Sequence, residues 1–338
     1  MNVLITGISG RIGAGVARRL VASGHKVRGL VWPQDRSLKR LGDLPIDLVE
    51  GSLSEPEVLH RAVNGMEIIC HLGAAFQAGG PFSHEDFFET NARGTFNLLE
   101  AALHNAPGLR RFIYASSDAL YDKYVPGGMD APIQVDSVTL APRGAYALTK
   151  HLGEELCWGY QRSFGLPITV LRFAMTMDAD EILDFAQFRL RHWLDAYAAK
   201  VESSDDPITD QVYDQLLALN NHEETLLVVR DEQGRAYKKH IAHVHDISHG
   251  VECAAQEEAA TGQAYQLAAP SAFTWDKAVP YLAQQLNLPF AEVQLLNNVP
   301  TFYEFDLNKS REDLGFSPQY DINAMIDAGI EYRKGQAC

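Results

Sequence analysis

Two side chains four positions apart carry the first sign of chemistry in this sequence, the phenol of Tyr146 and the amine of Lys150. Residues at this spacing share one face of a helix, so the Lys150 ammonium can stand beside the phenol and stabilise its phenolate. A phenol with an ordinary pKa of about 10 is a poor base at neutral pH, but a lowered pKa lets it exchange a proton with a substrate oxygen. The pair predicts general acid-base chemistry; the alternative is a packed aromatic ring beside a surface amine.

A glycine turn near the start of the chain is the second candidate site. It follows the apolar run 3–5 and precedes apolar residues at helical spacing, with glycines in the pattern GxxGxxG. Glycines let the backbone turn tightly and approach a pyrophosphate, which meets free N–H groups at the positive end of the helix. The turn therefore predicts a dinucleotide site that includes Gly7, Gly10, Arg11, Ile12 and Gly13.

The elements that must position these residues alternate between strand and helix through the first half of the chain. Apolar runs predict strands at 3–5, 26–31, 46–50, 67–72, 111–116 and 168–173, and helical periodicity predicts helices at 12–21, 57–64, 86–105 and 145–164. Such alternation is typical of a parallel sheet covered on both faces. We expect an α/β fold with a Rossmann-type doubly wound parallel sheet.

Beyond residue 175 the pattern becomes irregular, which indicates a second domain. We expect a dinucleotide-binding domain at 1–175, with segments near 236–260 returning to it, and a smaller C-terminal substrate-binding domain formed mainly by 176–338. An acid-rich insert spans 180–235. In it Phe185, Phe188, Trp193 and Tyr197 follow helical spacing, which indicates core packing or the lining of a substrate pocket or lid.

The sequence is acidic, with 44 Asp and Glu against 29 Lys and Arg and a formal net charge of -15 at pH 7. A negative surface repels nucleic acid and anionic lipid headgroups, so we expect a small-molecule substrate and neither of those partners. No apolar run approaches the roughly 18 to 20 residues that cross a bilayer, and the chain begins without a signal-peptide pattern. We therefore expect a cytoplasmic protein.

The order of these motifs resembles the extended short-chain dehydrogenase/reductase family, also called the NAD-dependent epimerase/dehydratase family. Besides the GxxGxxG turn and the YxxxK pair, further matches follow along nearly the whole chain: His71 to Ala75, Asn91 to Thr95, Ser116-Ser117 with Tyr121, Leu171-Arg172, His243-Val244 with Asp246, and Leu314 to Pro318. The resemblance implies an NAD(P)-binding enzyme that moves hydride at a secondary alcohol or ketone.

The resemblance also implies roles for single residues. Tyr146 would be the catalytic acid/base, Ser117 would hydrogen-bond the reacting oxygen, and Lys150 would also hold the nicotinamide ribose. Phe173 occupies the family's position on the nicotinamide side, where its ring suits stacking. The remaining cofactor contacts that the family's motifs imply are Ser52, Leu53, Leu72, Gly73, Ala74, Asn91 and Ser116.

Departures from the family's pattern bear on the substrate. Dehydratases of the family carry Thr-Asp-Glu where this chain has Ser117, Asp118 and Ala119, so elimination of water lacks its base and Asp118 is left to bind substrate or cap the turn. Met175 replaces an Asn that contacts the diphosphate of nucleotide sugars, which weakens that substrate class. Lys239 supports it, because members often have there an Arg that contacts the diphosphate. Asp118, Met175 and Lys239 are the candidate substrate residues.

The cofactor is NAD or NADP, and the sequence leaves the choice open. The second strand is followed by Trp32, whose ring can stack on adenine, instead of an acidic residue for a ribose 2'-hydroxyl or an Arg for a 2'-phosphate. Asp35 favours NAD. Three basic residues favour NADP: Arg11, Arg36 and Lys39.

Four histidines cluster at His240, His243, His245 and His249. The last two have the i, i+4 spacing of a helical metal pair, but no HExxH-type carboxylate accompanies them and the resembled family needs no metal. We expect no metal site and assign the cluster to a strand that leads into a helix.

Three functions follow from these residues. The first is an NAD(P)-dependent epimerase of a sugar or nucleotide sugar, supported by the motif series and Lys239. The second is a net dehydrogenase or ketoreductase on a non-nucleotide substrate, favoured by Met175, Trp32 and the aromatic insert. The third is a non-catalytic NAD(P)-binding regulator, against which the intact acid/base set argues. The resemblance also suggests a homodimer through the helices 86–105 and 145–164.

Overall fold

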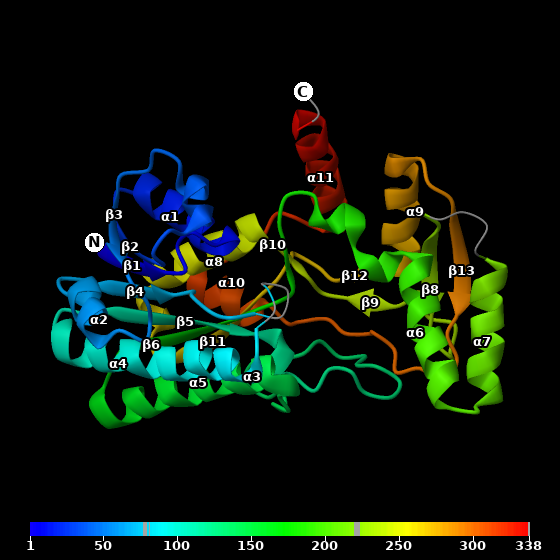
Figure 1. The fold of residues 1–338 in the computed structure, drawn as a ribbon, viewed down its shortest axis with the longest axis horizontal. Coiled ribbons are helices and arrows are strands. Elements are labelled where there is room, and N and C mark those ends of the chain that lie inside the picture. The colour runs from blue at the N-terminus through cyan, green and yellow to red at the C-terminus, as the bar shows by residue number, and fades with distance from the viewer. Residues whose placement is uncertain (77–79, 81, 220–223, 337–338) are drawn as a thin grey trace.

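The computed structural model describes residues 1–336 except 77–79, 81 and 220–223. Seven strands form its central sheet: β1 (Asn2–Thr6), β2 (Lys26–Val31), β3 (Ile46–Glu50), β4 (Ile68–His71), β5 (Arg111–Ser117), β6 (Ile168–Phe173) and β11 (Gln263–Leu267). They are all parallel and lie in the order β11-β6-β5-β4-β1-β2-β3 (Figure 1). The chain winds outward from β1 in both directions, so the expected Rossmann-type doubly wound sheet is confirmed.

Helices cover both faces of the sheet (Figure 1). Every residue of β4, β5 and β6 is buried, as the near-continuous apolar runs of these strands predict. One face is covered by α1 (Arg11–Ala22) and α8 (Val244–Gln256), and the other by α2 (Pro56–Val63), α4 (Gly94–Asn105) and α5 (Gly144–Phe164). In α1 the buried residues Ala14, Ala17 and Leu20 recur at helical spacing, which fixes the face that meets the sheet.

The helix predicted at 86–105 is not one regular α-helix. It begins as α3 (His84–Phe87), continues through a π-helical turn, η3 (Phe88–Arg93), and only then becomes α4. Ser83 caps its start, with the reciprocal Ser83–Asp86 hydrogen bonds of a capping box. Turns of the π type inside helices often occur at functional sites, and η3 packs against α5.

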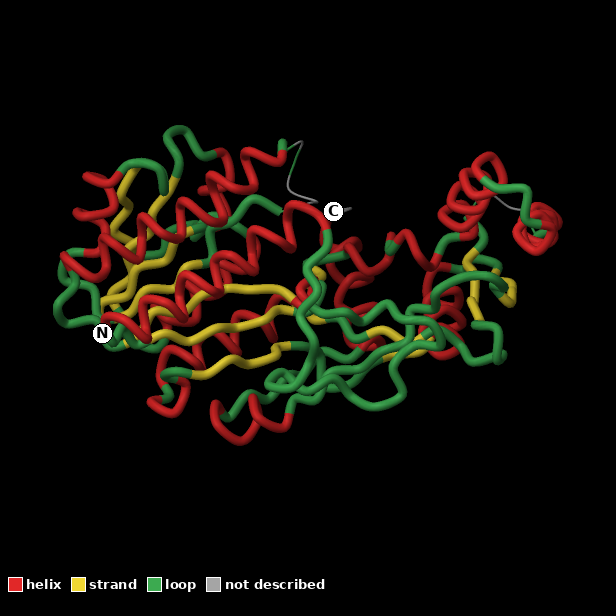
Figure 2. Tube along the Cα trace, turned by 90° about the horizontal axis from the view of Figure 1, so that it is seen from below, coloured by secondary structure: helices red, strands yellow, loops and turns green. Residues whose placement is uncertain are grey.

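A smaller body lies beyond the sheet along the long axis of the molecule (Figures 1 and 2). It has a hydrophobic core of its own, centred on aromatic side chains such as Phe188 and Trp275. Its elements are β7 (Thr176–Met177), η5 (Glu181–Asp184), η6 (Ala186–Phe188), α6 (Leu190–Ser203), α7 (Pro207–Ala218), β8 (Leu226–Arg230), β9 (Lys238–Lys239), β12 (Phe273–Thr274), α9 (Trp275–Leu286), β13 (Phe290–Gln294) and α11 (Ile322–Gln336).

The aromatic residues at helical spacing in the insert do not share one helix. Phe185 lies between the 3-10 turns η5 and η6, and Phe188 ends η6. The Phe188 N–H donates to the Phe185 carbonyl, which brings the two rings together, and only Trp193 and Tyr197 lie in α6. All four side chains are buried in the core of the smaller body. The stripe therefore serves packing.

Later parts of the chain return to the sheet. After β9, the short strand β10 (Ala242–His243) pairs with β7, and α8 then packs on α1. β11 extends the sheet beside β6, and α10 (Asn308–Leu314) packs on β11. These returns set the carboxyl ends of the sheet strands against the smaller body, which is where ligands of open parallel sheets bind.

Candidate active site

The glycine turn after β1 is shaped by two close backbone approaches. Gly7 has φ +70, and a Cβ atom there would lie 2.7 Å from the Cα of Gly73, which follows β4. A Cβ on Gly13 would lie 2.1 Å from the carbonyl oxygen of Gly7. Only glycine fits at either place, because side chains do not tolerate such distances. The sequence pattern is thus explained by sterics that bring the start of α1 close to the ends of β1 and β4.

The first turn of α1 keeps its N–H groups available for an anion. Gly10 is the N-cap residue, no side chain caps the helix, and the first turn contains no acidic residue. Its only charged side chain, Arg11, forms an ion pair with Glu181 of η5 in the smaller body. Ile12 and Gly13 follow within the same turn. Unpaired N–H groups and the positive end of the helix dipole together fit a pyrophosphate.

The segment after β2 approaches the same turn. The carboxylate of Asp35 accepts hydrogen bonds from the Ser9 hydroxyl, inside the glycine turn, and from the backbone N–H of Ser37. Trp32, just after β2, has 61% of its surface exposed and is free to stack on a flat ligand. Arg36 and Lys39 lie exposed in the 3-10 turn that follows.

The loop after β4 is tied to β1 and to η3. The backbone N–H of Gly73 donates to the Thr6 hydroxyl at 3.1 Å, which fixes Leu72, Gly73 and Ala74 beside the glycine turn. The Asn91 amide accepts from the backbone N–H of Ala75 and donates to its carbonyl, at 2.8 and 3.0 Å. Asn91 therefore braces the loop with its own polar atoms, a structural role that the sequence did not reveal.

Two further sequence candidates lie after β3. The Ser52 hydroxyl is buried and hydrogen-bonds the Ser54 hydroxyl at 2.6 Å. Leu53 packs on Gly94 at the start of α4, where a Cβ would lie 2.9 Å from the Leu53 Cβ. Both residues thus support the end of β3 through neighbouring elements.

Three candidates meet at the carboxyl ends of β5 and β6. Ser117 ends β5 and pairs in register with Phe173, which ends β6. The hydroxyl oxygen of Ser116 is buried and has no hydrogen-bond partner among the described residues. Because a buried polar atom without a partner is costly, this hydroxyl fits a site that a polar ligand completes.

Tyr146 lies in the first turns of α5, with its ring edge-on to Phe87 at a centroid distance of 6.1 Å. Burial raises the pKa of its phenol, and a hydrogen bond with Ser117 opposes that rise. The structure therefore brings Ser117 and Tyr146 together, as expected. The lowered pKa that the sequence suggested for Tyr146 is wrong for this structure, because burial of the phenol outweighs the favourable contacts of the phenolate.

Lys150 lies one turn further along α5 and is buried. Its ammonium is 4.2 Å from the centroid of the Tyr114 ring, and the Tyr114 hydroxyl donates to the Lys150 carbonyl. Burial lowers the pKa of Lys150 to about 8, although Cys157 and Glu154 act in the opposite direction. The amine is therefore held in place by an aromatic face from β5 and is near its titration point at mildly basic pH.

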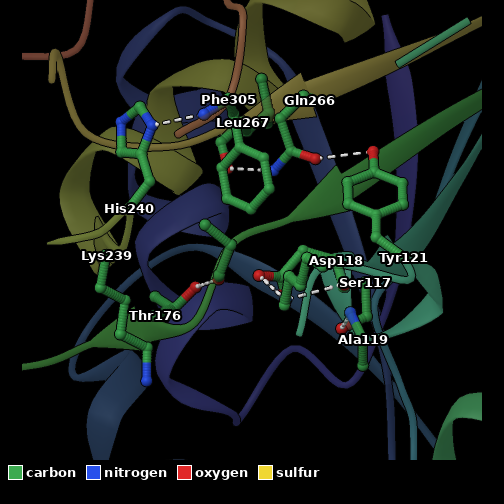
Figure 3. A network of polar contacts seen from close by, with 12 residues as sticks. Ser117, Asp118, Ala119, Tyr121, Thr176, Lys239, His240, Gln266, Leu267 and Phe305 are labelled. Atoms are coloured by element: carbon green, nitrogen blue, oxygen red, sulfur yellow. Dashed lines mark hydrogen bonds and ion pairs between the residues drawn. The ribbon is translucent and has the colours of Figure 1, made fainter. Parts of the chain in front are cut away.

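The three candidate substrate residues differ in exposure. Met175, just beyond β6, has 43% of its surface exposed, whereas Asp118 and Lys239 are buried. Asp118 forms an ion pair with Lys123, and Lys239 donates to the Gln187 side-chain oxygen at 2.9 Å. Figure 3 shows Lys239 and Thr176 in the same region as Ser117 and Asp118. Lys239, for which the sequence suggested a diphosphate contact, is thus buried and held by Gln187.

Several residues around the site carried no sequence signal. Lys123 follows β5 in an ordinary turn segment, Glu181 lies in the insert, and both reach the site only through tertiary packing. The buried His71 was part of a family motif, but its hydrogen bonds to Thr6 and Thr95, at 2.7 and 3.0 Å, appear only in the structure. No local pattern of the sequence could have identified these contacts.

The histidine cluster has packing partners instead of a shared ligand. The His243 ring stacks on Tyr320 at 4.1 Å and also accepts from the backbone N–H of His245. His249 contacts Cys253 one turn along α8. Within the described ranges, no group of three or more His, Cys, Asp or Glu side chains is arranged to hold a metal ion.

Comparison with known proteins gives a family match. The profile of the NAD dependent epimerase/dehydratase family matches residues 3–268. UDP-N-acetyl-alpha-D-glucosaminuronate decarboxylase of Bacillus cytotoxicus is 33% identical over 175 residues, which cover 50% of this chain and 53% of that protein. GDP-mannose 3,5-epimerase 1 of Oryza sativa subsp. japonica is 30% identical over 179 residues, 51% of this chain and 46% of that protein. The chain thus spans about half the length of these curated relatives.

Solved structures resemble the whole chain. A short-chain dehydrogenase/reductase superfamily protein from Agrobacterium tumefaciens, with bound NAD, superposes with a TM-score of 0.80 at 29% identity, covering 100% of this chain and 98% of that one. UDP-glucuronic acid 4-epimerase from Bacillus cereus, in complex with NAD, gives a TM-score of 0.72 at 18% identity and covers 100% of both chains. At that lower identity the likeness shows the fold alone.

Proposed function

The chain belongs to the NAD-dependent epimerase/dehydratase family, and from that premise we propose that it binds NAD or NADP and catalyses hydride transfer at a secondary alcohol of a sugar or nucleotide sugar, completed as an epimerisation. The observation that carries this proposal is the contact between Ser117 and Tyr146 at the carboxyl edge of the sheet. A hydroxyl pair at that edge, in line with a glycine turn, suits redox chemistry at a carbon that bears oxygen.

Each residue of the site has a distinct task in the proposal. Oxidation of the carbinol requires the phenolate of Tyr146, which takes the hydroxyl proton. The phenol so formed, which burial favours, returns that proton to the ketone oxygen when hydride comes back. Ser117 hydrogen-bonds the same oxygen and orients it. Lys150, buried one turn away, holds the cofactor ribose. The chemistry that a bound nicotinamide cofactor would supply here is reversible hydride transfer at the carbinol carbon.

The cofactor would lie along the glycine turn, with its pyrophosphate at the start of α1 and its nicotinamide toward Ser116 and Phe173. Two observations fit such a ligand, the close approach at Gly13 and the unpartnered Ser116 hydroxyl. At the adenosine end, the Asp35 carboxylate beside Ser9 favours a ribose 2'-hydroxyl and repels a 2'-phosphate. We therefore propose NAD as the preferred form.

The preference can be measured by titrating the protein with NADH and NADPH and following the fluorescence of the reduced nicotinamide. We expect wild type to bind NADH at least about tenfold more tightly, the scale of one charged contact. Asp35→Ser should reduce that preference by removing the carboxylate, whereas Asp43→Ser, an exposed acid in the next turn, should leave it unchanged. Equal affinities in wild type would contradict the assignment to NAD.

A net dehydrogenase or ketoreductase is the second candidate. It is favoured by the burial of Lys239, because the residue that supported a diphosphate contact is only 1% exposed. The exposed Met175, which lies just beyond the carboxyl end of β6, also has no side-chain group that donates a hydrogen bond to a diphosphate. Both candidates use the same Ser117 and Tyr146 chemistry and differ in whether the hydride returns to the substrate.

Elimination of water remains disfavoured in the proposal. Ala119 supplies no carboxylate as a base, and the Asp118 carboxylate is already paired with Lys123. The structural relatives nevertheless include a dTDP-glucose 4,6-dehydratase from Streptomyces venezuelae, and a decarboxylase is among the sequence relatives. An assay for the proposed reaction must therefore also look for dehydrated and decarboxylated products.

Mass spectrometry of the small molecules released on denaturation separates the two candidates. An epimerase regenerates its cofactor in each cycle and can retain it, whereas a net dehydrogenase must exchange it at each turnover. Near-stoichiometric NAD would favour epimerisation, and a sugar epimer seen by nuclear magnetic resonance without net NADH would establish it. An empty site that fills reversibly, with stoichiometric absorbance near roughly 340 nm, would favour the dehydrogenase.

The partners proposed for this chain are a small molecule and a second copy of itself. No helix in the described part of the chain is both long and apolar enough to cross a membrane. Five large apolar side chains lie exposed on the helical layer of η3, α4 and α5: Phe88, Phe96, Leu148, Leu152 and Phe164. A patch of this kind is typical of a protein interface.

A further inference from the structure

Two buried lysines near the catalytic pair have one carboxylate between them. Lys123 is 4% exposed, Lys239 is 1% exposed, and Asp118 is 5% exposed. Lysines are almost never fully buried unless they are paired, because transfer of an ammonium from water into a protein is costly. This cluster therefore holds an excess of buried positive charge that needs an explanation.

Asp118 is committed to Lys123. The Lys123 ammonium donates to the Asp118 carboxylate and, at 2.9 Å, to its backbone carbonyl. Aromatic faces complete the surroundings of this ammonium, with the Tyr303 and Tyr124 ring centroids at 5.0 and 5.6 Å. The pair leaves little of the Asp118 charge to serve a second cation.

Lys239 has no carboxylate partner among the described residues. Its ammonium donates to the neutral side-chain oxygen of Gln187 at 2.9 Å and lies 5.0 Å from the centroid of the Phe185 ring. Its neighbour in sequence, Lys238, instead pairs with Glu304 at 3.5 Å and is partly exposed. Burial lowers the pKa of Lys239 to about 8, and the charge of Lys123 adds to that effect, although Asp118 opposes it.

The cluster borders the reacting groups. Asp118 follows Ser117 directly, and its charge is close enough to act on the Tyr146 phenol. Lys239 and Thr176 appear together on one side of this region in Figure 3, with Ser117 and Asp118 across from them. The charge of Asp118, the residue directly after Ser117, also acts on Lys239, so an anion bound by Lys239 would lie in the neighbourhood of Asp118.

We propose that Lys239, backed by the Lys123–Asp118 pair, binds a carboxylate carried by the substrate close to the reacting carbinol, so that the preferred substrate is a sugar acid rather than a neutral sugar. This inference rests on the proposed function, because it assigns the substrate class of the same site. The carboxylate would supply the counter-charge that Lys239 lacks and would accept the hydrogen bonds that Gln187 leaves unused.

A carboxylate fits this place better than a diphosphate. Lys239 lies within reach of the charge of Asp118, which directly follows Ser117, so we expect the anion to be few bonds from the carbinol, as the acid group of a uronate is. A diphosphate carries more charge and volume than one buried ammonium and one neutral amide can satisfy. The site accordingly favours a compact monoanion.

Binding experiments on full-length, NAD-loaded protein test the inference. Affinities are measured by calorimetry for matched pairs that differ at one carbon: D-glucuronate and D-glucose, D-galacturonate and D-galactose, UDP-glucuronate and UDP-glucose. We expect the acid of at least one pair to bind at least about a hundredfold more tightly than its neutral partner, since sites built for a polar group reject analogues that lack it.

Variants locate the effect. Lys239→Met keeps an unbranched side chain that is one atom shorter and has no charge. It should abolish the preference for the acid while leaving the affinity for NAD unchanged. Lys238→Met is the matched control, because this neighbouring lysine faces Glu304 and Phe302, and it should retain the full preference. Thermal unfolding of both variants reports whether each is folded.

The outcomes distinguish the inference from the proposed function. Equal affinity for acid and neutral partners in every pair, or an acid preference that survives in Lys239→Met, overturns the carboxylate site even if sugars are epimerised. If no sugar changes the redox state of the cofactor but acids bind in a Lys239-dependent manner, the proposed function fails and the carboxylate site stands. Loss of folding in Lys239→Met leaves the wild-type pairs as the deciding comparison.

Discussion

At the scale of single residues, the candidate site is marked by buried polar groups that have few or no hydrogen-bond partners. The Ser116 hydroxyl has none among the described residues, Lys239 has only a neutral amide, and the Tyr146 phenol depends on Ser117. Each of these groups is costly to bury alone and is accounted for if a cofactor and an anionic substrate complete it. The residues that look unsatisfied are therefore the ones on which the proposed chemistry depends.

His240 has no proposed catalytic role, but its protonation state also depends on burial and on its hydrogen-bond partners. Its Nδ1 accepts from the backbone N–H of Phe305 at 3.0 Å (Figure 3), and its Nε2 donates to the Ala269 carbonyl at 2.8 Å, a pattern that requires the neutral ring. Burial lowers the pKa of His240 to about 4 from the ordinary 6.5. The unfolded chain therefore binds a proton between these two pH values that the folded protein does not.

The neutral, buried His240 therefore contributes fully to the free energy of unfolding above about pH 6.5. This contribution is lost as the pH falls from about 6.5 toward 4. Between pH 7 and pH 5 the free energy of unfolding should fall by about 2 kcal/mol less in His240→Gln than in wild type. Urea unfolding at the two pH values measures this difference. His104→Gln, at an exposed position, is the control. An identical pH dependence in wild type and His240→Gln would contradict the neutral, buried histidine.

At the scale of elements, helix α5 carries two of the proposed catalytic residues, Tyr146 and Lys150, and their anchor on one face. Tyr146, Lys150 and Glu154 are spaced four residues apart, and Glu154 forms a two-point ion pair with Arg172 of β6, at 2.9 and 2.8 Å. Both side chains are buried. The ion pair thus fixes the position of α5 against the strand that ends in Phe173, and with it the place of Tyr146.

We expect Glu154→Gln to lower the free energy of unfolding by about 3 to 5 kcal/mol, because it leaves the Arg172 charge buried without a counter-ion. Urea unfolding measures the loss. Glu155→Gln, on the exposed side of the same turn, should change stability by less than about 0.5 kcal/mol. If the two variants were equally stable, α5 would not depend on the ion pair.

The sequence predicts such elements well where one face of a regular pattern is buried. The limits expected for β2, β3 and β6 agree with the structure to the residue. In β6 every residue is buried, and a buried parallel strand is a continuous apolar run bounded by turns. The π-helical turn η3 and the 3-10 turns η5 and η6 were not predictable, since their residues keep a spacing close to that of an α-helix. Their backbone geometry is set by tertiary contacts instead.

Some residues of the candidate site could likewise be predicted from the sequence, and others could not. The glycine turn and the Ser117, Tyr146 and Lys150 set follow from motifs, because their chemistry requires fixed spacing. The role of Lys123 could not be predicted from the sequence. Its ion pair with Asp118 and its contact with the Tyr303 ring depend on the path of a loop, which tertiary packing decides. The raised pKa of Tyr146 was also missed, because a sequence does not show how deeply a phenol is buried.

At the scale of the whole molecule, the two bodies meet over the carboxyl edge of the sheet and leave an apolar face on the opposite layer. Contacts such as Arg11–Glu181 and Lys239–Gln187 connect the cofactor side and the substrate side to the smaller body. The helices α4 and α5, by contrast, expose large apolar side chains that the single chain does not cover. We propose that a second copy covers them in a four-helix contact.

Sedimentation equilibrium should then give a mass of about twice the chain mass of 37.4 kDa. Leu152→Glu places a charge in the centre of the proposed contact and should shift the mass to that of one chain. Leu217→Glu, which changes an exposed leucine on α7, should remain a dimer. A single-chain mass for wild type would refute the homodimer.

The most direct measurement of the central claim follows the cofactor itself in Tyr146→Phe. NAD-loaded protein is mixed rapidly with the sugar and sugar-acid pairs, and absorbance near roughly 340 nm reports the reduced nicotinamide. We predict that wild type produces this signal with at least one substrate, and that Tyr146→Phe binds NAD equally well but produces it at least about a hundredfold more slowly. An unchanged rate in Tyr146→Phe would show that the phenol takes no part in the reaction and would contradict the account.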